Sequence, residues 1–219
     1  MRRDAPTDGG YVVGVTGGIA SGKSTFARIL AEAAPSVLVD ADRLGHEVLA
    51  RPEIAQALAR TFGDDVLGPD GRVKRGVLGP RAFASPERLA ALNAIVEEPL
   101  TGLAERAVLA AARGDARLVV LDAALLVEWD KGAWCDRVVA VVCDPEVRIA
   151  RLVARTGLPR EEAARRVAAQ LPDAARAAYA DETLVNEGTL PAFEREARAL
   201  AVAIVERARA ALAARGRVL

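Results

Sequence analysis

Two patterns of apolar residues alternate along the chain. Short apolar runs, typical of strands buried on both faces of a sheet, occur at residues 11–15, 37–39, 117–122, 137–144 and 183–185. Segments with apolar residues at helical spacing follow or separate these runs. We therefore expect the α/β class, with a five-stranded parallel sheet that helices cover on both faces.

Start and stop signals bound the expected helices. Ser85 suits the N-cap of a helix and Pro86 its first position, whereas Pro99 predicts a break or kink further on. The glycine-rich stretch 63–80 predicts loop and turns. Other helices are expected after residue 23, from 43 to 62 with an interruption at Pro52, through 145–180 with a break at 157–159, and from about 191 to 214.

The first apolar run leads into VTGGIASGKST, residues 15–25, which fits the pattern G-x-x-x-x-G-K-[ST] of a P-loop. Glycines there let backbone N–H groups beside a helix N-terminus approach phosphate oxygens. Lys23 would reach the β and γ phosphates, and the Ser24 hydroxyl would bind Mg²⁺. The loop thus predicts a P-loop NTPase-type fold, and the residues expected to bind ATP are Gly18, Ile19, Ala20, Ser21, Gly22, Lys23, Ser24 and Thr25. The alternative is a glycine-rich turn that binds nothing.

Composition supports the P-loop interpretation and excludes other classes. Of the 30 basic residues, three are lysines: Lys23, Lys74 and Lys131. Because the chain otherwise uses arginine, a chance match to the P-loop pattern, which requires lysine at position 23, is less expected. Because 30 acidic residues balance the basic ones, no global field would attract nucleic acid or anionic lipid. The two cysteines and single histidine, His46, lack metal-site spacing and suit a reducing cytosol.

The apolar segments are short of a membrane span, which needs roughly 18 or more apolar residues. Residues 1–10 lack the apolar core of a secretion signal and are expected to form a mobile tail. A cytoplasmic protein with no nucleic-acid or membrane partner is the expectation.

Three carboxylates follow apolar runs, where a parallel sheet places its active edge. Asp40 and Asp42 follow the second run, and a carboxylate there would accept a proton from an acceptor hydroxyl or help to hold Mg²⁺. The alternative for Asp42 is to cap the helix that starts at Arg43. Asp122 closes the third run and resembles a Walker B aspartate that binds Mg²⁺ directly or through water; a surface carboxylate is the alternative.

Arg148, Arg151 and Arg155 are three and four residues apart, so they share one helix face. Such a face either closes over transferring phosphates or is a solvated, salt-bridged surface. Single residues leave the same choice open: His46 contacts phosphate or is an exposed helical residue, and Trp129 and Trp134 touch a ligand or pack. The two cysteines are expected to pack.

The order of the motifs resembles the dephospho-coenzyme A kinase family from residue 11 to about 190. The carriers of the resemblance are GVTGGIASGKST, VLVDAD, LNAIVEEPL, DAALLVE, CDPEVRIARLVARTGLPREEAARRVAAQLP and NEGTL. The resemblance implies a single kinase domain over residues 11–219, with a helical substrate-side insertion at about 44–114 and a lid at about 150–176. A monomer or weak homo-oligomer is expected.

The activity that this resemblance implies is transfer of the ATP γ-phosphate, with Mg²⁺, to the ribose 3′-hydroxyl of dephospho-coenzyme A. Asp42 would act as the base, with Lys23, Arg151 and Arg155 as the other catalytic residues. Asn186 would lie near the adenine. The residues implied to bind dephospho-coenzyme A are Asp40, Asp42, Leu125 and Glu128.

The chain departs from the family pattern at three positions. Glu98 precedes Pro99 where the family commonly has histidine, Ala124 replaces a proline, and Ala20 replaces a P-loop glycine. The first two departures leave open a nucleoside or nucleotide kinase of the same fold. A nucleotide-binding regulatory module without transfer activity is the other alternative.

Overall fold

The computed structural model describes residues 9–219, so most of the predicted tail lies outside the described residues. Gly9 and Gly10, expected to belong to that tail, are instead buried, and the Gly10 N–H donates to the Ala112 carbonyl at 2.7 Å. The described chain divides into two compact units. One comprises the residues up to Asp40 together with Glu105–Leu219, and the other is Ala41–Ala104.

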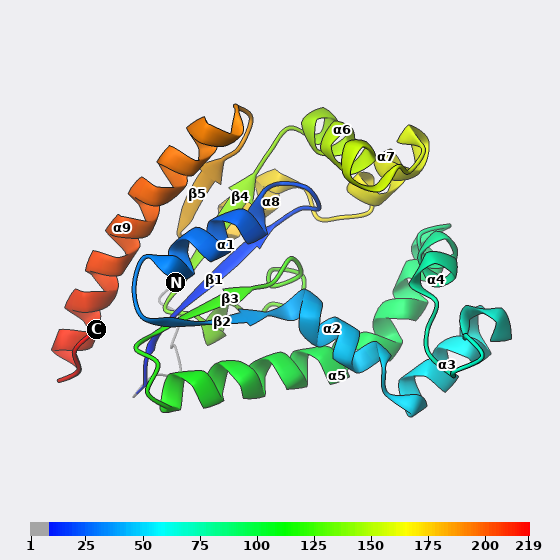
Figure 1. The fold of residues 1–219 in the computed structure, drawn as a ribbon, viewed down its shortest axis with the longest axis horizontal. Helices are drawn as coiled ribbons and strands as arrows, with labels where there is room; N and C mark the ends of the chain where they lie inside the picture. Colours follow the sequence, from blue (N-terminus) through cyan, green and yellow to red (C-terminus); the bar gives the residue numbers. More distant parts are fainter. Residues whose placement is uncertain (1–8) are drawn as a thin grey trace. The chain divides into compact units, whose positions relative to one another are not determined.

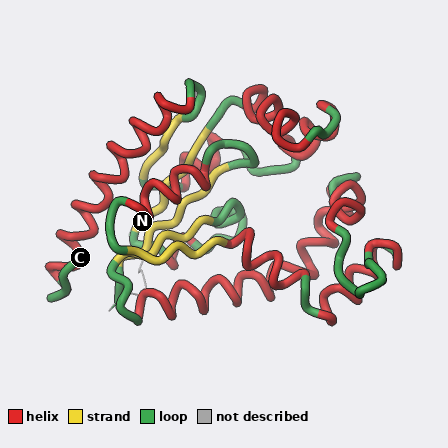
Figure 2. Tube along the Cα trace, viewed as in Figure 1, coloured by secondary structure: helices red, strands yellow, loops and turns green. Residues whose placement is uncertain are grey.

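The first unit is built on a parallel sheet with the order β2-β3-β1-β4-β5 (Figures 1 and 2). This confirms the predicted α/β fold. The first strand in sequence occupies the centre of the sheet, so the loop that follows it emerges at the middle of the carboxyl edge. The strands are β1 Tyr11–Gly17, β2 Ser36–Asp40, β3 Leu118–Asp122, β4 Arg137–Val142 and β5 Glu182–Val185.

Helices cover both faces of this sheet. The helices α1, Lys23–Glu32, and α9, Leu190–Ala214, pack on one face, where Phe26 and Ile204 are fully buried against β1 and its neighbours (Figure 1). On the opposite face, Gly14 admits no side chain, because a Cβ there would lie 2.5 Å from Leu126 Cδ2. The remaining helices of this unit are α6 Pro145–Thr156, α7 Arg160–Ala168 and α8 Asp173–Tyr179, together with a short turn η2 Gly132–Trp134.

The second unit is helical, as expected of the insertion predicted at about 44–114, although its bounds are Ala41–Ala104. Leu58 and Val66 are fully buried in its own core. The elements are α2 Ala41–Leu49, α3 Pro52–Phe62, η1 Asp64–Val66, α4 Arg75–Ala82 and α5 Pro86–Arg113, of which residues up to Ala104 belong to this unit.

Two local predictions are wrong in this unit. The stretch 63–80 was expected to be loop, yet α4 begins at Arg75, because burial of Leu78 and Ala82 outweighs the low helix propensity of the glycines. Pro99 was expected to break or kink the helix, and the break is wrong, because α5 runs through this residue. The Thr101 hydroxyl donates to the carbonyl oxygens of Glu97 and Glu98, at 2.8 and 3.1 Å, on the turn around the proline.

Other local predictions are confirmed. The Arg88 N–H donates to the Ser85 hydroxyl at 3.3 Å, so Ser85 caps α5, and Pro86 is its first residue. Gly157 ends α6 in the left-handed region, with φ of 70°. Within the described part of the chain, no helix has the length and apolar character to cross a membrane.

Candidate functional site

The loop between β1 and α1 has the backbone that the P-loop pattern predicts. Gly22 has φ of 99°, and a Cβ there would lie 2.2 Å from Asn186 Nδ2, so glycine is required on both grounds. Ala20, which stands where the family has glycine, is itself held at φ of 61°. The left-handed region is unfavourable for alanine, so the loop holds Ala20 in a conformation that glycine adopts freely.

Lys23 and Asp122 form a buried ion pair between the P-loop and β3. Their exposed fractions are 7% and 3%, and the Lys23 ammonium donates to Asp122 Oδ1. Asp122 reaches the loop because β3 lies beside β1, with Asp122 in register with Val15. The interpretation of Asp122 as a surface carboxylate is therefore wrong.

Asn186, directly after β5, links the P-loop to α6. Its Nδ2 donates to the Ser21 carbonyl at 2.7 Å, and its Oδ1 accepts from Arg151 Nη2 at 3.2 Å. A cavity of about 400 Å³ opens beside these contacts. Its lining combines predicted residues from three parts of the sequence: Ala20, Gly22, Thr25, Arg151, Arg155 and Asn186.

Two further contacts to the P-loop were not predicted. The Ile19 N–H donates to Gln170 Oε1 at 2.7 Å, across 151 positions of sequence. Ile19 and Ala20 also pack on the apolar cluster that joins α6 to α7, which includes Ile149 and Val167. Gln170 lies in the segment 143–172 that carries the family resemblance, but no role was predicted for it.

The two remaining strand-end carboxylates fall in different units. Asp40 is the last residue of β2 and is in register with Asp122. Asp42 is the second residue of α2 in the second unit. Because α2 already begins at Ala41, Asp42 lies in the first helical turn and not at the cap position before Arg43. Its charge suits that turn.

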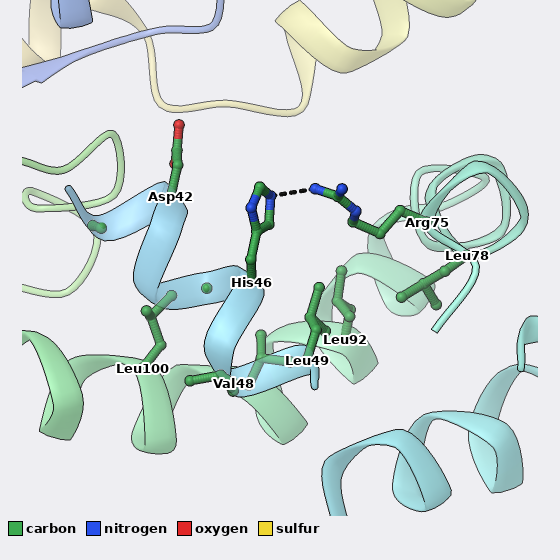
Figure 3. A pocket seen from close by; sticks show the side chains of 11 residues that line it. Asp42, His46, Val48, Leu49, Arg75, Leu78, Leu92 and Leu100 are labelled. Atoms are coloured by element: carbon green, nitrogen blue, oxygen red, sulfur yellow. Dashed lines mark hydrogen bonds between the residues drawn. The ribbon is translucent and has the colours of Figure 1, made fainter. Parts of the chain in front are cut away.

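A second cavity, of about 370 Å³, lies within the second unit beside Asp42 (Figure 3). Its apolar walls come from α2, α4 and α5. Asp42 and His46 lie one turn apart on α2, and His46 Nε2 is in hydrogen-bond contact with Arg75 Nη1 of α4 (Figure 3). The cavity thus joins apolar walls, which include Val48, Leu78, Leu92 and Leu100, to a polar rim.

Comparison with known proteins decides the family. The family model for dephospho-CoA kinase matches residues 11–192, most of the chain. The chain belongs to the dephospho-CoA kinase family. A dephospho-CoA kinase of Streptomyces avermitilis is 42% identical over 90% of this chain and 95% of its own, and one of Geobacter metallireducens is 40% identical over 86% and 94%.

Solved structures have the same fold. The Thermus thermophilus protein TT1252 is 34% identical, with a TM-score of 0.68 over 90% of this chain and 98% of its own. A dephospho-CoA kinase from Campylobacter jejuni has a TM-score of 0.58 at 23% identity, over 88% and 96%, and supports the fold.

In this member of the dephospho-CoA kinase family, Glu128 pairs with a buried arginine, Arg176. Its carboxylate forms two hydrogen bonds with Arg176 of α8, one of them at 3.1 Å. Arg176 is fully buried, and its Nη1 also donates to the Ala124 carbonyl at 2.6 Å and to Thr16 Oγ1 at 3.1 Å. Together these contacts fix the turn after β3, which carries the half-buried Leu125. The substrate contacts expected of Leu125 and Glu128 stay predictions.

We expect an Arg176→Met variant to unfold at lower denaturant concentration, with a loss of about 2–4 kcal/mol. Removing one partner of a buried pair costs about 3–5 kcal/mol, and the figure is lowered here because the Glu128 side chain is 26% exposed. Urea unfolding measures the difference. Arg195→Met, at an exposed position of α9, is the matched control, expected within about 0.5 kcal/mol of the parent. Equal stability of both variants would contradict the assignment.

The tryptophans and cysteines pack in the interior. Trp129 and Trp134 are 8% and 9% exposed, and both cysteines are buried and free of disulfides. Burial raises the pKa of the Cys143 thiol. The Arg151 guanidinium, whose Nη1 donates to Cys143 Sγ at 3.4 Å, acts in the opposite direction and is outweighed.

Cys143 should therefore react slowly with Ellman's reagent in the native protein. A raised pKa lowers the thiolate fraction at neutral pH, and the thiolate is the nucleophile. In a Cys135→Ala background, we expect the native rate at pH 7.5 to be at least about tenfold below the rate in guanidinium chloride. Equal rates in the two conditions would show that the thiol is accessible and unperturbed.

Proposed function

We propose that this protein transfers the γ-phosphate of ATP to the ribose 3′-hydroxyl of dephospho-coenzyme A and releases coenzyme A and ADP. Family membership supports the reaction. The observation that carries the proposal is the cavity beside the P-loop, which Arg151, Arg155 and Asn186 line together with loop residues. It provides a place for the nucleoside of ATP next to the loop that would hold the phosphates.

Mg²⁺ fits the oxygen groups beside the P-loop. The Ser24 hydroxyl is exposed, 3.5 Å from Lys23 Nζ, and the Asp122 carboxylate is close to the same ammonium. Over residues 9–219, no three histidine, cysteine or acidic side chains are grouped to hold a metal. A magnesium ion that takes most of its ligands from phosphate and water suits this arrangement, and Ser24 and Asp122 would hold it directly or through water. It would offset charge on the transferring phosphate.

The acceptor side of the proposal rests on the cavity in the second unit. Its apolar walls suit the pantetheine arm, and the Arg75 guanidinium at its rim, in contact with His46, suits a diphosphate. Asp42 lines the same cavity and would accept the proton of the 3′-hydroxyl. Asp42 follows Asp40, the last residue of β2, by two positions, so the Cα atoms of the two residues are at most about 7 Å apart.

Glu98, which together with Ala124 motivated the alternative of a nucleoside or nucleotide kinase, is exposed on α5 and does not line the cavity beside Asp42. Glu98 is therefore not placed to contact an acceptor in this cavity, and it no longer supports a nucleoside or nucleotide kinase. Dephospho-coenzyme A is the acceptor that family membership and cavity lining favour together.

The decisive experiment offers the purified protein Mg-ATP with dephospho-coenzyme A, adenosine and AMP in separate reactions. Chromatography and mass spectrometry identify the products, with authentic coenzyme A as the standard for 3′-phosphorylation. We expect rapid conversion of dephospho-coenzyme A alone, abolished by EDTA and restored by Mg²⁺. Preference for adenosine or AMP would replace the proposal by a nucleoside or nucleotide kinase. ATP binding without transfer to any acceptor would favour a regulatory module.

A further inference from the structure

Arg148 is buried beside the P-loop with much of its hydrogen-bonding capacity unused. Its side chain is 4% exposed, and its Nε and Nη1 atoms have no hydrogen-bond partner. The nearest anion is Asp173, whose Oδ1 lies 3.5 Å from Arg148 Nη1 and also has no hydrogen-bond partner. The other oxygen of Asp173 accepts from the Cys143 N–H at 2.9 Å. A buried guanidinium left with open donors is unfavourable unless a ligand or an ordered water completes its contacts.

The guanidinium of Arg148 lies against the first arm of the P-loop. A Cβ built on Gly18 would lie 1.6 Å from Arg148 Nη1, so the absence of a side chain at Gly18 makes room for the arginine. The same point is 3.2 Å from Gln170 Oε1, the atom that accepts from the Ile19 N–H. Arg148 and Gln170 therefore meet the loop at the same place, Gly18–Ile19.

Gly18 and Ile19 do not line the cavity beside the P-loop, whereas Ala20, further along the loop, does. Gly22 and Thr25, at the other arm, line the cavity with Asn186 and Arg155. If that cavity holds the nucleoside, the phosphates extend from it along the loop, and the terminal phosphate comes nearest to the opposite arm. A phosphate there carries oxygens that open guanidinium donors bind well.

We propose that Arg148 binds the terminal phosphoryl group of ATP and stabilises its charge during transfer, which makes it a further catalytic residue. The inference rests on the proposed function. Sequence spacing placed Arg148 with Arg151 and Arg155, yet only Arg148 is buried against the loop, while Arg155 is exposed.

The chemical step balances without a proton from Arg148. The bond between the γ-phosphorus and the bridging oxygen breaks, and its electron pair stays on the ADP oxygen. A new bond forms between the phosphorus and the acceptor 3′-oxygen, whose proton passes to Asp42. Arg148 stays charged throughout and donates N–H bonds to non-bridging phosphoryl oxygens, whose charge Mg²⁺ and Lys23 also offset.

The test compares Arg148→Gln, Arg148→Lys and Asp173→Asn. Two readouts are needed: kcat with dephospho-coenzyme A, and the affinities for ADP and for the non-hydrolysable analogue AMP-PNP by calorimetry. We expect Arg148→Gln to lower kcat about 10²-fold, on the scale of one lost electrostatic donor, with partial recovery in Arg148→Lys. Affinity for AMP-PNP should fall while that for ADP stays within about twofold, because only AMP-PNP has a terminal phosphate for Arg148.

Asp173→Asn is the matched control, because it removes the ion-pair partner and leaves an oxygen for the Cys143 amide. If Arg148 served only to pair with Asp173, this variant would reproduce the Arg148→Gln effects; we expect a much smaller loss of kcat than in Arg148→Gln, because the guanidinium donors that would meet the phosphate remain. Unchanged kcat in Arg148→Gln, or equal loss of ADP and AMP-PNP affinity, would overturn the inference.

The binding readout separates this inference from the proposed function. If the parent protein fails to phosphorylate dephospho-coenzyme A, yet Arg148→Gln selectively loses AMP-PNP affinity, the terminal-phosphate contact stands and the acceptor assignment fails. If Arg148→Gln does not fold, Arg148→Lys carries the test. A folded Arg148→Lys variant with parental kcat and parental preference for AMP-PNP over ADP would show that the guanidinium fork itself is dispensable and contradict the hydrogen-bonding role.

Discussion

An Asp42→Asn variant should bind ATP as the parent does and lose phosphoryl transfer to dephospho-coenzyme A by about 10²–10⁴-fold, the range for removal of a general base. The P-loop residues and the cavity with Asn186 belong to the first unit, whereas Asp42 belongs to the second. Changing Asp42 therefore alters none of the nucleotide contacts in the first unit. Asparagine keeps the size of the side chain and removes its ability to accept a proton.

The measurement is kcat at saturating Mg-ATP and dephospho-coenzyme A, beside ATP affinity by calorimetry. Glu47→Gln is the matched control: it makes the same change of charge on the same helix, at a half-exposed carboxylate that pairs with Arg43. We expect its kcat to stay within about twofold of the parent, since surface ion pairs contribute little. Parental turnover in Asp42→Asn would remove Asp42 from the mechanism and leave the hydroxyl to lose its proton to solvent.

The strands and the P-loop were predictable because their signals are local. A strand buried on both faces requires a continuous apolar run, and a phosphate loop requires glycine and lysine at fixed spacing. Both requirements are met by residues close together in sequence. The central strands and the loop after β1 agree with these predictions, whereas the edge strands β2 and β5 expose Val37, Leu38 and Val185.

The contacts that complete the site were less predictable, because they depend on which elements become neighbours. From sequence alone, Asp122 could bind metal or lie on the surface. The position of β3 beside β1 excludes the surface role, because it brings the carboxylate to Lys23. Gln170 and Arg148 reach the loop across more than a hundred residues. Sequence spacing left Arg148 a choice between a phosphate-facing role and a solvated one, and Gln170 lay in a motif of the resemblance with no role attached to it.

Helix limits in the second unit were wrong for a related reason. Pro99 and the glycines near Leu78 weaken a helix in isolation, and a prediction from sequence counts that weakness alone. The packing of Leu78 in a separate apolar core is a long-range gain. This packing stabilises α4, and the spacing of apolar residues in the sequence does not reveal it.

Replacing Lys23 should have two separable effects, one on catalysis and one on stability. In a Lys23→Ala variant we expect transfer to fall about 10²–10³-fold, because an ammonium aimed at the β and γ phosphates is lost. Without nucleotide, the same change leaves Asp122 buried and without its ammonium partner. We expect the free protein to lose about 3–5 kcal/mol of stability.

A double-mutant cycle with Asp122→Asn separates the two effects. In Lys23→Ala/Asp122→Asn no unpaired buried charge remains, so urea unfolding should show most of the lost stability restored, while transfer stays at or below the level of the single variant. Lys131→Ala is the control, because that lysine lies over Trp134, 5.7 Å from the ring centroid, and its loss should cost no more than about 1 kcal/mol. If the double variant is less stable than Lys23→Ala, Asp122 stabilises the folded state through contacts other than the ion pair with Lys23. If phosphoryl transfer recovers in the double variant along with stability, Lys23 affects catalysis only by neutralising Asp122. The proposed contact between Lys23 and the phosphates would then be contradicted.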